Sequence, residues 1–433
     1  MKKILLLYRN AYGGLSRPAW MMSLVMLINR CGAMVTPFLG VYLIGELGYS
    51  LKEAGAILSI YGLGSVCGSF LGGWLTDRIG HFRVQFVALT LGGSLYFLLL
   101  NLRQFEYLAV GVFMLSLVND CLRPANSASI AHYAKPENMT RAFSLNRMAI
   151  NLGFSVGPAL GGLLAALSYR WLFIADGITC IGAGIFFYLY FRQKPSNRPQ
   201  PPVQEIATAN PGKSPYTDLL FLLFVLFCCV FATVFFQLLS TLPLYYKQVY
   251  QLTEGKIGLL MGLNGMIVFL LEMILVYLLG ERFPRKYVVA AGVLLVGLSF
   301  ISLNLMAHGS ILIISMLLLS ISEILAMPYM TTLTVERSDA STRGAYMGLY
   351  TISYSAAHVV APLLGTSIIS AFGFSTLWWT SGGLAAVAAA GLYLVVQAME
   401  KQWKKNQHLA KPTVDGLAIG SAAGAEEVSE GLF

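Results

Sequence analysis

Charged residues are scarce in this chain. Asp, Glu, Lys and Arg make up 11% of its 433 residues, whereas hydrophobic residues make up 57%. A water-soluble protein of this length needs far more polar surface, so the composition excludes a soluble enzyme and indicates that most of the chain lies in lipid. At ~20 apolar residues for each crossing, the apolar content is enough for about twelve membrane-spanning helices.

Motifs typical of catalytic or metal-binding sites are missing as well. The sequence contains no HExxH, no P-loop and no serine and histidine arrangement of a hydrolase. Its six cysteines lie inside apolar segments as small packing residues, without the spacing of a zinc site or a disulfide framework. We therefore predict no enzymatic activity, no metal and no bound cofactor. The apolar run at residues 4–7 is too short for a signal peptide, so no cleaved signal is expected.

The net charge of +9 follows from the membrane topology. With the N-terminus in the cytoplasm, most Lys and Arg residues fall on the cytoplasmic side, as the positive-inside rule requires. We therefore expect both termini in the cytoplasm, a bacterial inner membrane as the location, and no nucleic-acid partner. The basic residues expected on the opposite side are Lys52, Arg103, Arg170, Lys247 and Lys256. The predicted spans are residues 19–44, 53–76, 83–102, 106–133, 140–167, 170–192, 216–246, 254–279, 285–306, 309–334, 342–371 and 375–399.

The chain divides into two similar halves. Residues 194–215 are rich in proline and polar side chains, which predicts a cytoplasmic linker between a six-helix bundle at 1–193 and a second one at 216–400. Three motifs recur at one offset, which indicates a duplicated unit. Asp77-Arg78 corresponds to Glu281-Arg282, Pro124 to Pro328, and the segment 157–161 to the segment 361–365. Residues 401–433 are expected to form a disordered cytoplasmic tail.

The loop after the second span carries a recognisable pattern. Residues 73–83 read GWLTDRIGHFR, which fits G-x-x-x-D-R-x-G-x-x-R and resembles the signature of the major facilitator superfamily. The resemblance implies two pseudo-symmetric six-helix bundles and transport by alternating access, with a latch that breaks when the halves rock. An ordinary basic loop is the alternative. The predicted latch residues are Gly73, Asp77, Arg78, Gly80 and Arg83. The second copy lacks the glycine, so only the first is expected to act as a latch.

A glycine and proline pattern in the fifth span is similar to the motif of proton-driven antiporters in that superfamily. Glycines four residues apart let two helices approach closely, and a proline frees a backbone carbonyl and bends the helix. The pattern favours the drug:proton antiporter branch, with simple close packing as the alternative. Its residues are Gly153, Gly157, Pro158, Gly161 and Gly162.

Ionisable residues inside spans are few, and such residues usually mark function. The resemblance places spans one, four, seven and ten around a central cavity, with Arg30, Asp120 and Arg123 on one wall and Glu323 on the other. Asp120 and Arg123 are three residues apart and can pair. Because burial away from water favours a neutral carboxyl group, we predict that Glu323 carries the coupling proton. The alternative is a polar group bonded to a neighbouring helix.

Further residues complete the predicted site. Arg147 and Glu272 lie at matching depths in spans five and eight, which the resemblance makes neighbours, so a gating or structural ion pair is favoured over a second proton site. His358 is a secondary proton-coupling candidate or a packing residue. Gln237 and Tyr329 are expected to line the cavity and join Arg30 and Arg123 in substrate binding. Asp120 and Glu272 complete the proton-coupling candidates.

These features predict a secondary active transporter without a cofactor, driven by the proton gradient. The leading hypothesis is an exporter of amphipathic small molecules or drugs that acts as a monomer in the lipid bilayer. A proton-coupled uptake symporter for a small polar nutrient or peptide is the main alternative, because Arg30 could bind a substrate carboxylate. A membrane-embedded enzyme or receptor is the remote alternative.

Overall fold

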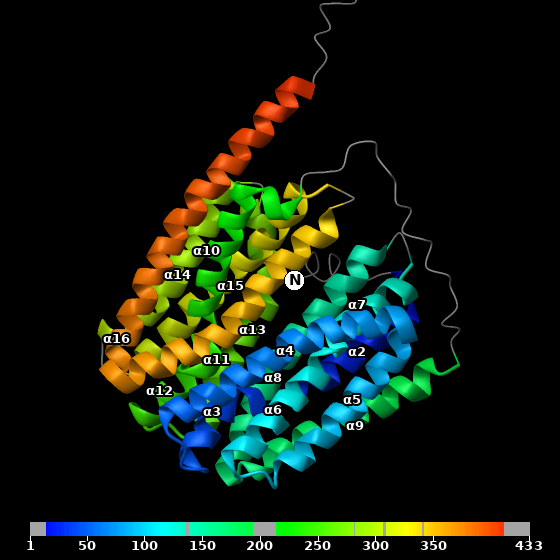
Figure 1. Cartoon of the computed structure of the whole chain (residues 1–433), viewed down its shortest axis with the longest axis vertical. Coiled ribbons are helices and arrows are strands. Elements are labelled where there is room, and N and C mark those ends of the chain that lie inside the picture. Colours follow the sequence, from blue (N-terminus) through cyan, green and yellow to red (C-terminus); the bar gives the residue numbers. More distant parts are fainter. Residues whose placement is uncertain are drawn as a thin grey trace, which may run out of the picture.

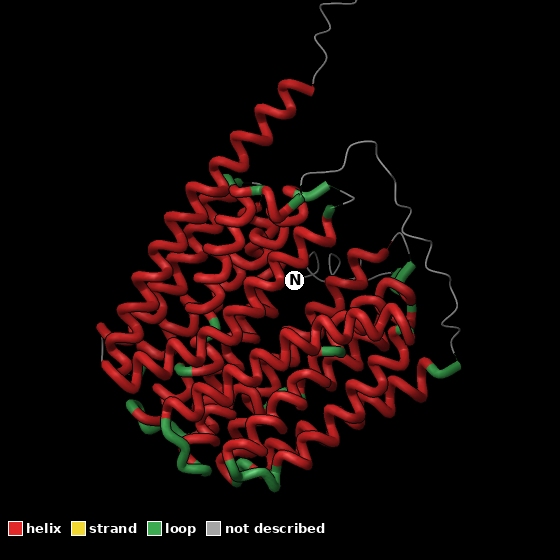
Figure 2. The backbone as a smooth tube through the Cα atoms, in the orientation of Figure 1, coloured by secondary structure: helices red, strands yellow, loops and turns green. Residues whose placement is uncertain are grey.

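The computed structural model describes residues 14–135, 138–193, 214–280, 282–305, 309–339 and 342–410. Within these ranges all regular secondary structure is helical (Figure 2). Residues 194–213 of the expected linker and 411–433 of the expected tail lie outside the described residues. The last helix continues to Ala410, so the start of the expected disordered tail at residue 401 is helical instead.

The first half of the chain forms six spans. Spans one and four are each built from two consecutive helices, separated at residues 32–34 and at Cys121, and the other four are single helices. The elements are α2 (Arg17–Cys31) with α3 (Val35–Gly45), α4 (Leu51–Ile79), α5 (His81–Leu99), α6 (Phe105–Asp120) with α7 (Leu122–Tyr133), α8 (Met139–Leu167) and α9 (Arg170–Phe191).

The second half also forms six spans. After the short helix η2 (Pro215–Thr217), span seven is broken into three helices, the first break lying near the position that corresponds to the break in span one, whereas span ten is a single helix. The final helix bends at Gly373, whose φ of +81° only glycine adopts readily, so its two arms are spans eleven and twelve. The elements are α10 (Leu219–Phe235) with α11 (Gln237–Ser240) and α12 (Leu242–Gln248), α13 (Glu254–Gly280), α14 (Arg285–Leu305), α15 (Ser310–Arg337) and α16 (Arg343–Ala410).

Eleven described helical segments are long and apolar enough to cross a membrane. The last of them covers both arms of α16, so the segments amount to the twelve spans that the sequence predicts. The two bundles meet at one end and diverge at the other (Figure 1). We name the meeting end the closed end, where α4 and α13 begin, and the diverging end the latch end, where α4 gives way to α5.

Two helix pairs join the halves toward the closed end. In the first pair, α8 lies against α13 with almost no side chain between the backbones. A Cβ atom at Gly258 would lie 2.3 Å from the carbonyl oxygen of Pro158 and 2.9 Å from Cα of Gly162. In the second pair, α4 lies against α16, and the Ser59 hydroxyl donates a hydrogen bond of 2.8 Å to the Val359 carbonyl. Glycine therefore sets how closely the halves meet.

A polar clasp closes the same end. The Tyr169 hydroxyl, between α8 and α9, donates a hydrogen bond of 2.8 Å to the Glu254 carboxylate at the start of α13. Lys247 of α12 forms an ion pair with the same carboxylate. The clasp joins the first half to the second through one acidic residue.

Candidate functional site

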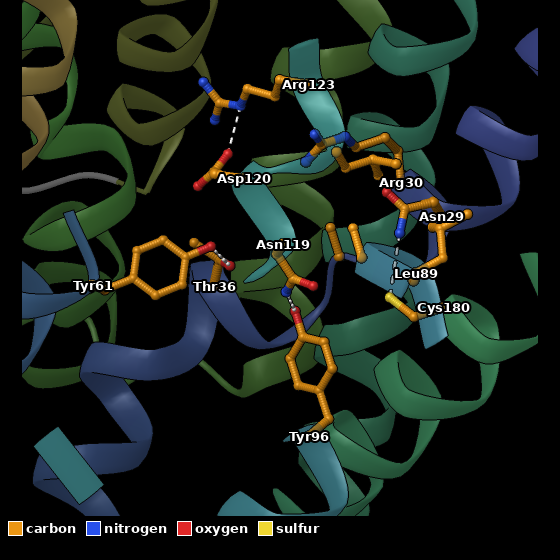
Figure 3. Close-up of a pocket in the computed structure, with 14 residues that line it drawn as sticks. Asn29, Arg30, Thr36, Tyr61, Leu89, Tyr96, Asn119, Asp120, Arg123 and Cys180 are labelled. Atoms are coloured by element: carbon orange, nitrogen blue, oxygen red, sulfur yellow. Dashed lines mark hydrogen bonds and ion pairs between the residues drawn. The ribbon is translucent and has the colours of Figure 1, made fainter. Parts of the chain in front are cut away.

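A polar pocket lies inside the first half, between spans one, two, three, four and six (Figure 3). The volume open to the centres of water-sized groups is about 50 Å³. Because one water needs about 10–15 Å³ by this measure, the pocket has room for a few waters or one small polar group. Among the lining residues are Asn29, Arg30, Thr36, Tyr61, Tyr96, Asn119, Asp120, Arg123 and Cys180.

Hydrogen bonds between neighbouring helices fix the floor of this pocket. The Asn119 amide donates to the Tyr96 hydroxyl at 3.2 Å, and the Asn29 amide lies 3.2 Å from the Cys180 sulfur. Figure 3 shows these residues below the charged groups of the pocket. The floor is therefore held by four different spans, which keeps its polar atoms in place without a ligand.

Asp120 and Arg123 form the predicted pair at the junction of α6 and α7. The Arg123 Nε lies 2.6 Å from a carboxylate oxygen of Asp120. Asp120 is buried, whereas the Arg123 side chain is 53% exposed although it belongs to a membrane span. Arg123 is therefore not enclosed by the other spans, unlike its partner Asp120.

Arg30 stands apart from this pair. Its Nε is buried without a hydrogen-bond partner, and no ion pair in the described part of the chain involves its guanidinium. The guanidinium carbon lies 5.7 Å from the centre of the Phe154 ring, which is a cation–π distance. The pocket thus contains two arginines and one acid, an excess of one positive charge.

A buried acid positions Arg30. Span one breaks after Cys31, and the free N–H groups at the start of α3 need acceptors. The Asp176 carboxylate of α9 accepts from the backbone N–H groups of Met34 at 2.9 Å and of Val35 at 3.0 Å. Asp176 is fully buried. It was missed in the sequence reasoning, although an acid inside span six meets the same criterion as the other ionisable residues.

We expect Asp176→Ala to lower the stability of the protein by roughly 1–3 kcal/mol, because the buried Val35 N–H loses its acceptor, whereas the Met34 N–H keeps its second hydrogen bond, to the Gly32 carbonyl at 2.7 Å. Asp176→Asn keeps one acceptor and should cost about half as much. Thermal unfolding in detergent measures both. Thr179→Ala is the matched control one turn along α9, since the Thr179 hydroxyl bonds only to carbonyls of its own helix. Equal losses in Asp176→Ala and the control would contradict the capping role.

Glu323 lies in the second half, on α15. Its carboxylate accepts a hydrogen bond of 3.4 Å from the Asn264 amide of α13, which also donates to the Ser320 hydroxyl at 3.0 Å. Within the described residues Glu323 makes no ion pair. Among the predicted proton-coupling acids Asp120, Glu272 and Glu323, it is therefore the one that forms no ion pair with an arginine in the described part of the chain.

Arg147 and Glu272 form an ion pair across the two halves, as their matching depths predict. Glu272 also accepts a hydrogen bond of 3.0 Å from Asn151, one turn along α8. The Glu272 side chain is only 12% exposed, whereas that of Arg147 is 54% exposed. Among the contacts between α8 and α13 given above, this ion pair lies nearest the diverging end.

Two residues that were predicted to bind substrate, Gln237 and Tyr329, form hydrogen bonds with neighbouring helices. Gln237 is buried, its amide NH₂ donating to the Ala361 carbonyl at 2.9 Å and its amide oxygen accepting from Thr241 at 2.8 Å. It joins span eleven to the break in span seven. The Tyr329 hydroxyl donates to the Val276 carbonyl at 3.2 Å and fastens α15 to α13. That these residues take part in substrate binding stays a prediction; in this structure both side chains are buried and hydrogen-bonded to backbone carbonyls.

His358 lies in a packed contact between span seven and the first half, and its role in proton coupling stays a prediction. Its ring stacks on that of Phe236, with centroids 3.6 Å apart. Its backbone carbonyl lies against Gly62 of the first half, where a Cβ atom would come within 2.6 Å. His358 therefore supports the contact between α16 and α4.

The predicted latch is disengaged in this structure. Gly80 adopts φ +85° and ends α4, so the expected tight turn is present. The Arg78 guanidinium lies 4.4 Å from the Trp74 ring centre. Asp77 and Arg83 are exposed, and neither forms an ion pair with another described residue. The expected bridge between helix ends is absent at the end where the halves are apart.

The glycine and proline motif of α8 packs against span one on one side of the helix and against α13 on the other. A Cβ atom at Gly153 would lie 2.4 Å from Cβ of Arg30, and one at Gly161 would lie 2.9 Å from Cβ of Met34. Gly157 faces the same break in span one. Pro158 and Gly162 face α13 instead. The motif therefore lies between residues 30–34 of span one and the second half of the chain.

A model of the Major Facilitator Superfamily matches residues 21–279 and 254–422. The chain belongs to this superfamily. A bundle of twelve helices, a broken first and seventh span and the loop signature of residues 73–83 agree with that assignment. As a superfamily member the chain is an integral membrane transporter.

Curated relatives extend the comparison. An uncharacterised MFS-type transporter, YttB of Bacillus subtilis, is 26% identical over 81% of this chain and 88% of its own. A Na(+), Li(+), K(+)/H(+) antiporter of Planococcus maritimus is 25% identical over 83% and 91%. The class C tetracycline resistance protein of Escherichia coli is 25% identical over 79% and 85%.

Solved structures show the same fold. A peptide transporter POT in complex with sulfate superimposes with a TM-score of 0.75, covering 90% of this chain and 96% of its own. At 20% identity this likeness concerns the fold alone.

Proposed function

We propose that this chain is a proton-coupled exporter of amphipathic small molecules, with Glu323 as the carrier of the coupling proton. The observation that carries the proposal is the state of the three acids near the centre. Asp120 is bound to Arg123 and Glu272 to Arg147, so protonating either acid would leave an arginine without its partner. Glu323 is held only by the neutral Asn264, so it can gain or lose a proton without breaking an ion pair.

The arrangement of the halves supports alternating access. They touch through glycines and the Tyr169–Glu254–Lys247 clasp at one end and are apart at the other, where Arg123 and Arg147 are half-exposed. With both termini in the cytoplasm, the open side faces the cytoplasm, which is the side from which an exporter loads. The relatives named as a Na(+), Li(+), K(+)/H(+) antiporter and as a tetracycline resistance protein support export.

A proton-coupled uptake symporter is the second candidate. It is favoured by the unpaired Arg30 in a pocket lined by polar residues, which suits a small polar substrate. The two candidates differ in the direction of substrate movement under the same proton gradient, so one measurement separates them.

The test measures accumulation of two fluorescent amphipathic probes, one cationic and one carrying a carboxylate, in cells that lack their own exporters. Cells that express the wild type should accumulate less of at least one probe than vector controls, and a protonophore should remove the difference. Higher accumulation than in the controls supports uptake. If neither probe differs from the controls, the proposed substrate range is wrong.

We expect Asp77→Asn to slow turnover about tenfold, a change of ~1.4 kcal/mol, with the substrate KM within about twofold. The reason is that Asp77 has no partner in this open state, so its contacts must form when the latch end closes. Initial rates of probe transport at several concentrations measure both quantities. Glu106→Gln, an exposed acid at the start of α6, is the control. A large rise in KM at unchanged turnover would contradict the latch role.

A further inference from the structure

The strongest unexplained feature of the site is the Arg30 guanidinium. The Arg30 side chain is partly buried and its Nε is buried without a hydrogen-bond partner, and a cation withdrawn from water without a counter-ion costs free energy. The one acid that lines the same pocket, Asp120, is bound to Arg123 at 2.6 Å. Arg30 is left with the face of Phe154, which cannot replace a hydrogen-bonding anion. The pocket therefore has one unbalanced positive charge at a place where a ligand can enter.

The Arg30 segment is also fixed in position before any ligand binds. Asp176 holds the break in span one next to it, and the backbone of residues 30–33 lies against Gly153 and Gly157 of α8. In Figure 3 the Arg30 and Arg123 side chains lie at the same end of the pocket, above Asn119. A preorganised guanidinium loses little conformational freedom on binding and presents its donors in the planar fork that suits a carboxylate.

We propose that this pocket is an anion subsite that binds the carboxylate of the transported substrate, with Arg30 as its main ligand and Arg123 as the second cation. The inference rests on the proposed transport function and narrows it to amphipathic molecules that carry a carboxylate. Because the pocket holds only a few water-sized groups, it takes the acidic head group alone. The apolar part of the substrate extends toward the space between the halves.

Binding to the purified full-length protein in detergent tests the subsite without a proton gradient. Three probes share one phenylalkyl skeleton and differ in head group: 4-phenylbutyrate, 4-phenylbutyramide and 4-phenylbutylamine. We expect the wild type to bind the carboxylate at least about tenfold more tightly than the amide or the amine, as measured by calorimetry or ligand-induced thermal stabilisation. Equal binding of all three probes, or preference for the amine, would overturn the proposal.

Arg30→Gln should weaken binding of 4-phenylbutyrate by about tenfold or more and remove its advantage over the amide. Arg30→Lys keeps the charge and should recover part of that affinity, which a merely structural role for Arg30 would not predict. Arg103→Gln, the same change at an exposed position between α5 and α6, is the matched control and should bind like the wild type. Unchanged carboxylate binding in a folded Arg30→Gln protein would contradict the subsite.

Failure of this proposal and failure of proton-coupled export give different results. If the purified protein selects the carboxylate but cells show no protonophore-sensitive accumulation difference, the subsite stands and export is wrong. If export is observed while head-group selection and the Arg30 dependence are absent, export stands and the anion subsite is wrong.

Discussion

We expect Glu323→Gln to abolish protonophore-sensitive transport while the protein remains folded in the membrane. Gln is close to the protonated acid in size and polarity, so the hydrogen bond with Asn264 survives in altered form and the fold is preserved. What is lost is the ability to exchange a proton. Uphill transport driven by an imposed pH gradient in proteoliposomes should fall at least about a hundredfold, whereas exchange of substrate without a net gradient should continue.

The matched control for this result is Ser320→Ala, one turn earlier on α15. Ser320 accepts from the same Asn264 amide, so its loss perturbs the same hydrogen-bond group without removing an ionisable side chain. This variant should keep uphill transport within about threefold of the wild type. Retained uphill transport in Glu323→Gln would move the coupling proton to another group.

The second large effect concerns the contact between α8 and α13. Gly258→Val places a branched side chain where a single Cβ atom would already lie 2.3 Å from the Pro158 carbonyl oxygen and 2.9 Å from Cα of Gly162. Because backbone atoms cannot move aside, α8 and α13 cannot come into contact at the closed end. Transport should therefore fall below about a hundredth of the wild-type rate. Each half retains its own packing, so the protein should still reach the membrane.

Gly255→Val is the control for this experiment. It lies one turn away on the same helix, and a Cβ atom there would meet only the Leu163 side chain at 3.7 Å. We expect near-normal transport from it. The distance between spin labels on α8 and α13 at the closed end should increase in Gly258→Val alone. Normal transport by that variant would mean that the closed end never adopts this contact in the membrane.

The arrangement of spans could be predicted from the sequence because lipid leaves few alternatives. Every crossing must be a helix of about 20 apolar residues, so counting apolar runs gives the number of spans. The common offset of Pro124 and Pro328 identifies two halves. The pairing of Arg147 with Glu272 was predictable for the same reason, since the rise along a helix converts sequence position into depth.

The directions in which side chains point were harder to predict from the sequence. Gln237 was expected in the cavity, but span seven breaks at Phe236 and turns the amide toward Ala361. The clasp was not found because Tyr169, Lys247 and Glu254 lie at the ends of different spans, and Tyr169 is 85 residues away from Glu254 in the sequence. Asp176 could have been found from its position alone, but its role depends on the break at Met34.

The interruptions of spans one and seven give both bundles a joint at corresponding heights. An unbroken helix that bends must give up hydrogen bonds of its own backbone, which resists motion. In span one those bonds are already replaced by the Asp176 carboxylate, and in span seven the Gln237 and Thr241 side chains bond to each other beside the break. Both breaks are also tied to a neighbouring helix, because Asp176 of α9 bonds to the start of α3 and Gln237 bonds to the Ala361 carbonyl of α16. A displacement of α9 or α16 is therefore passed directly to the outer segment of span one or span seven.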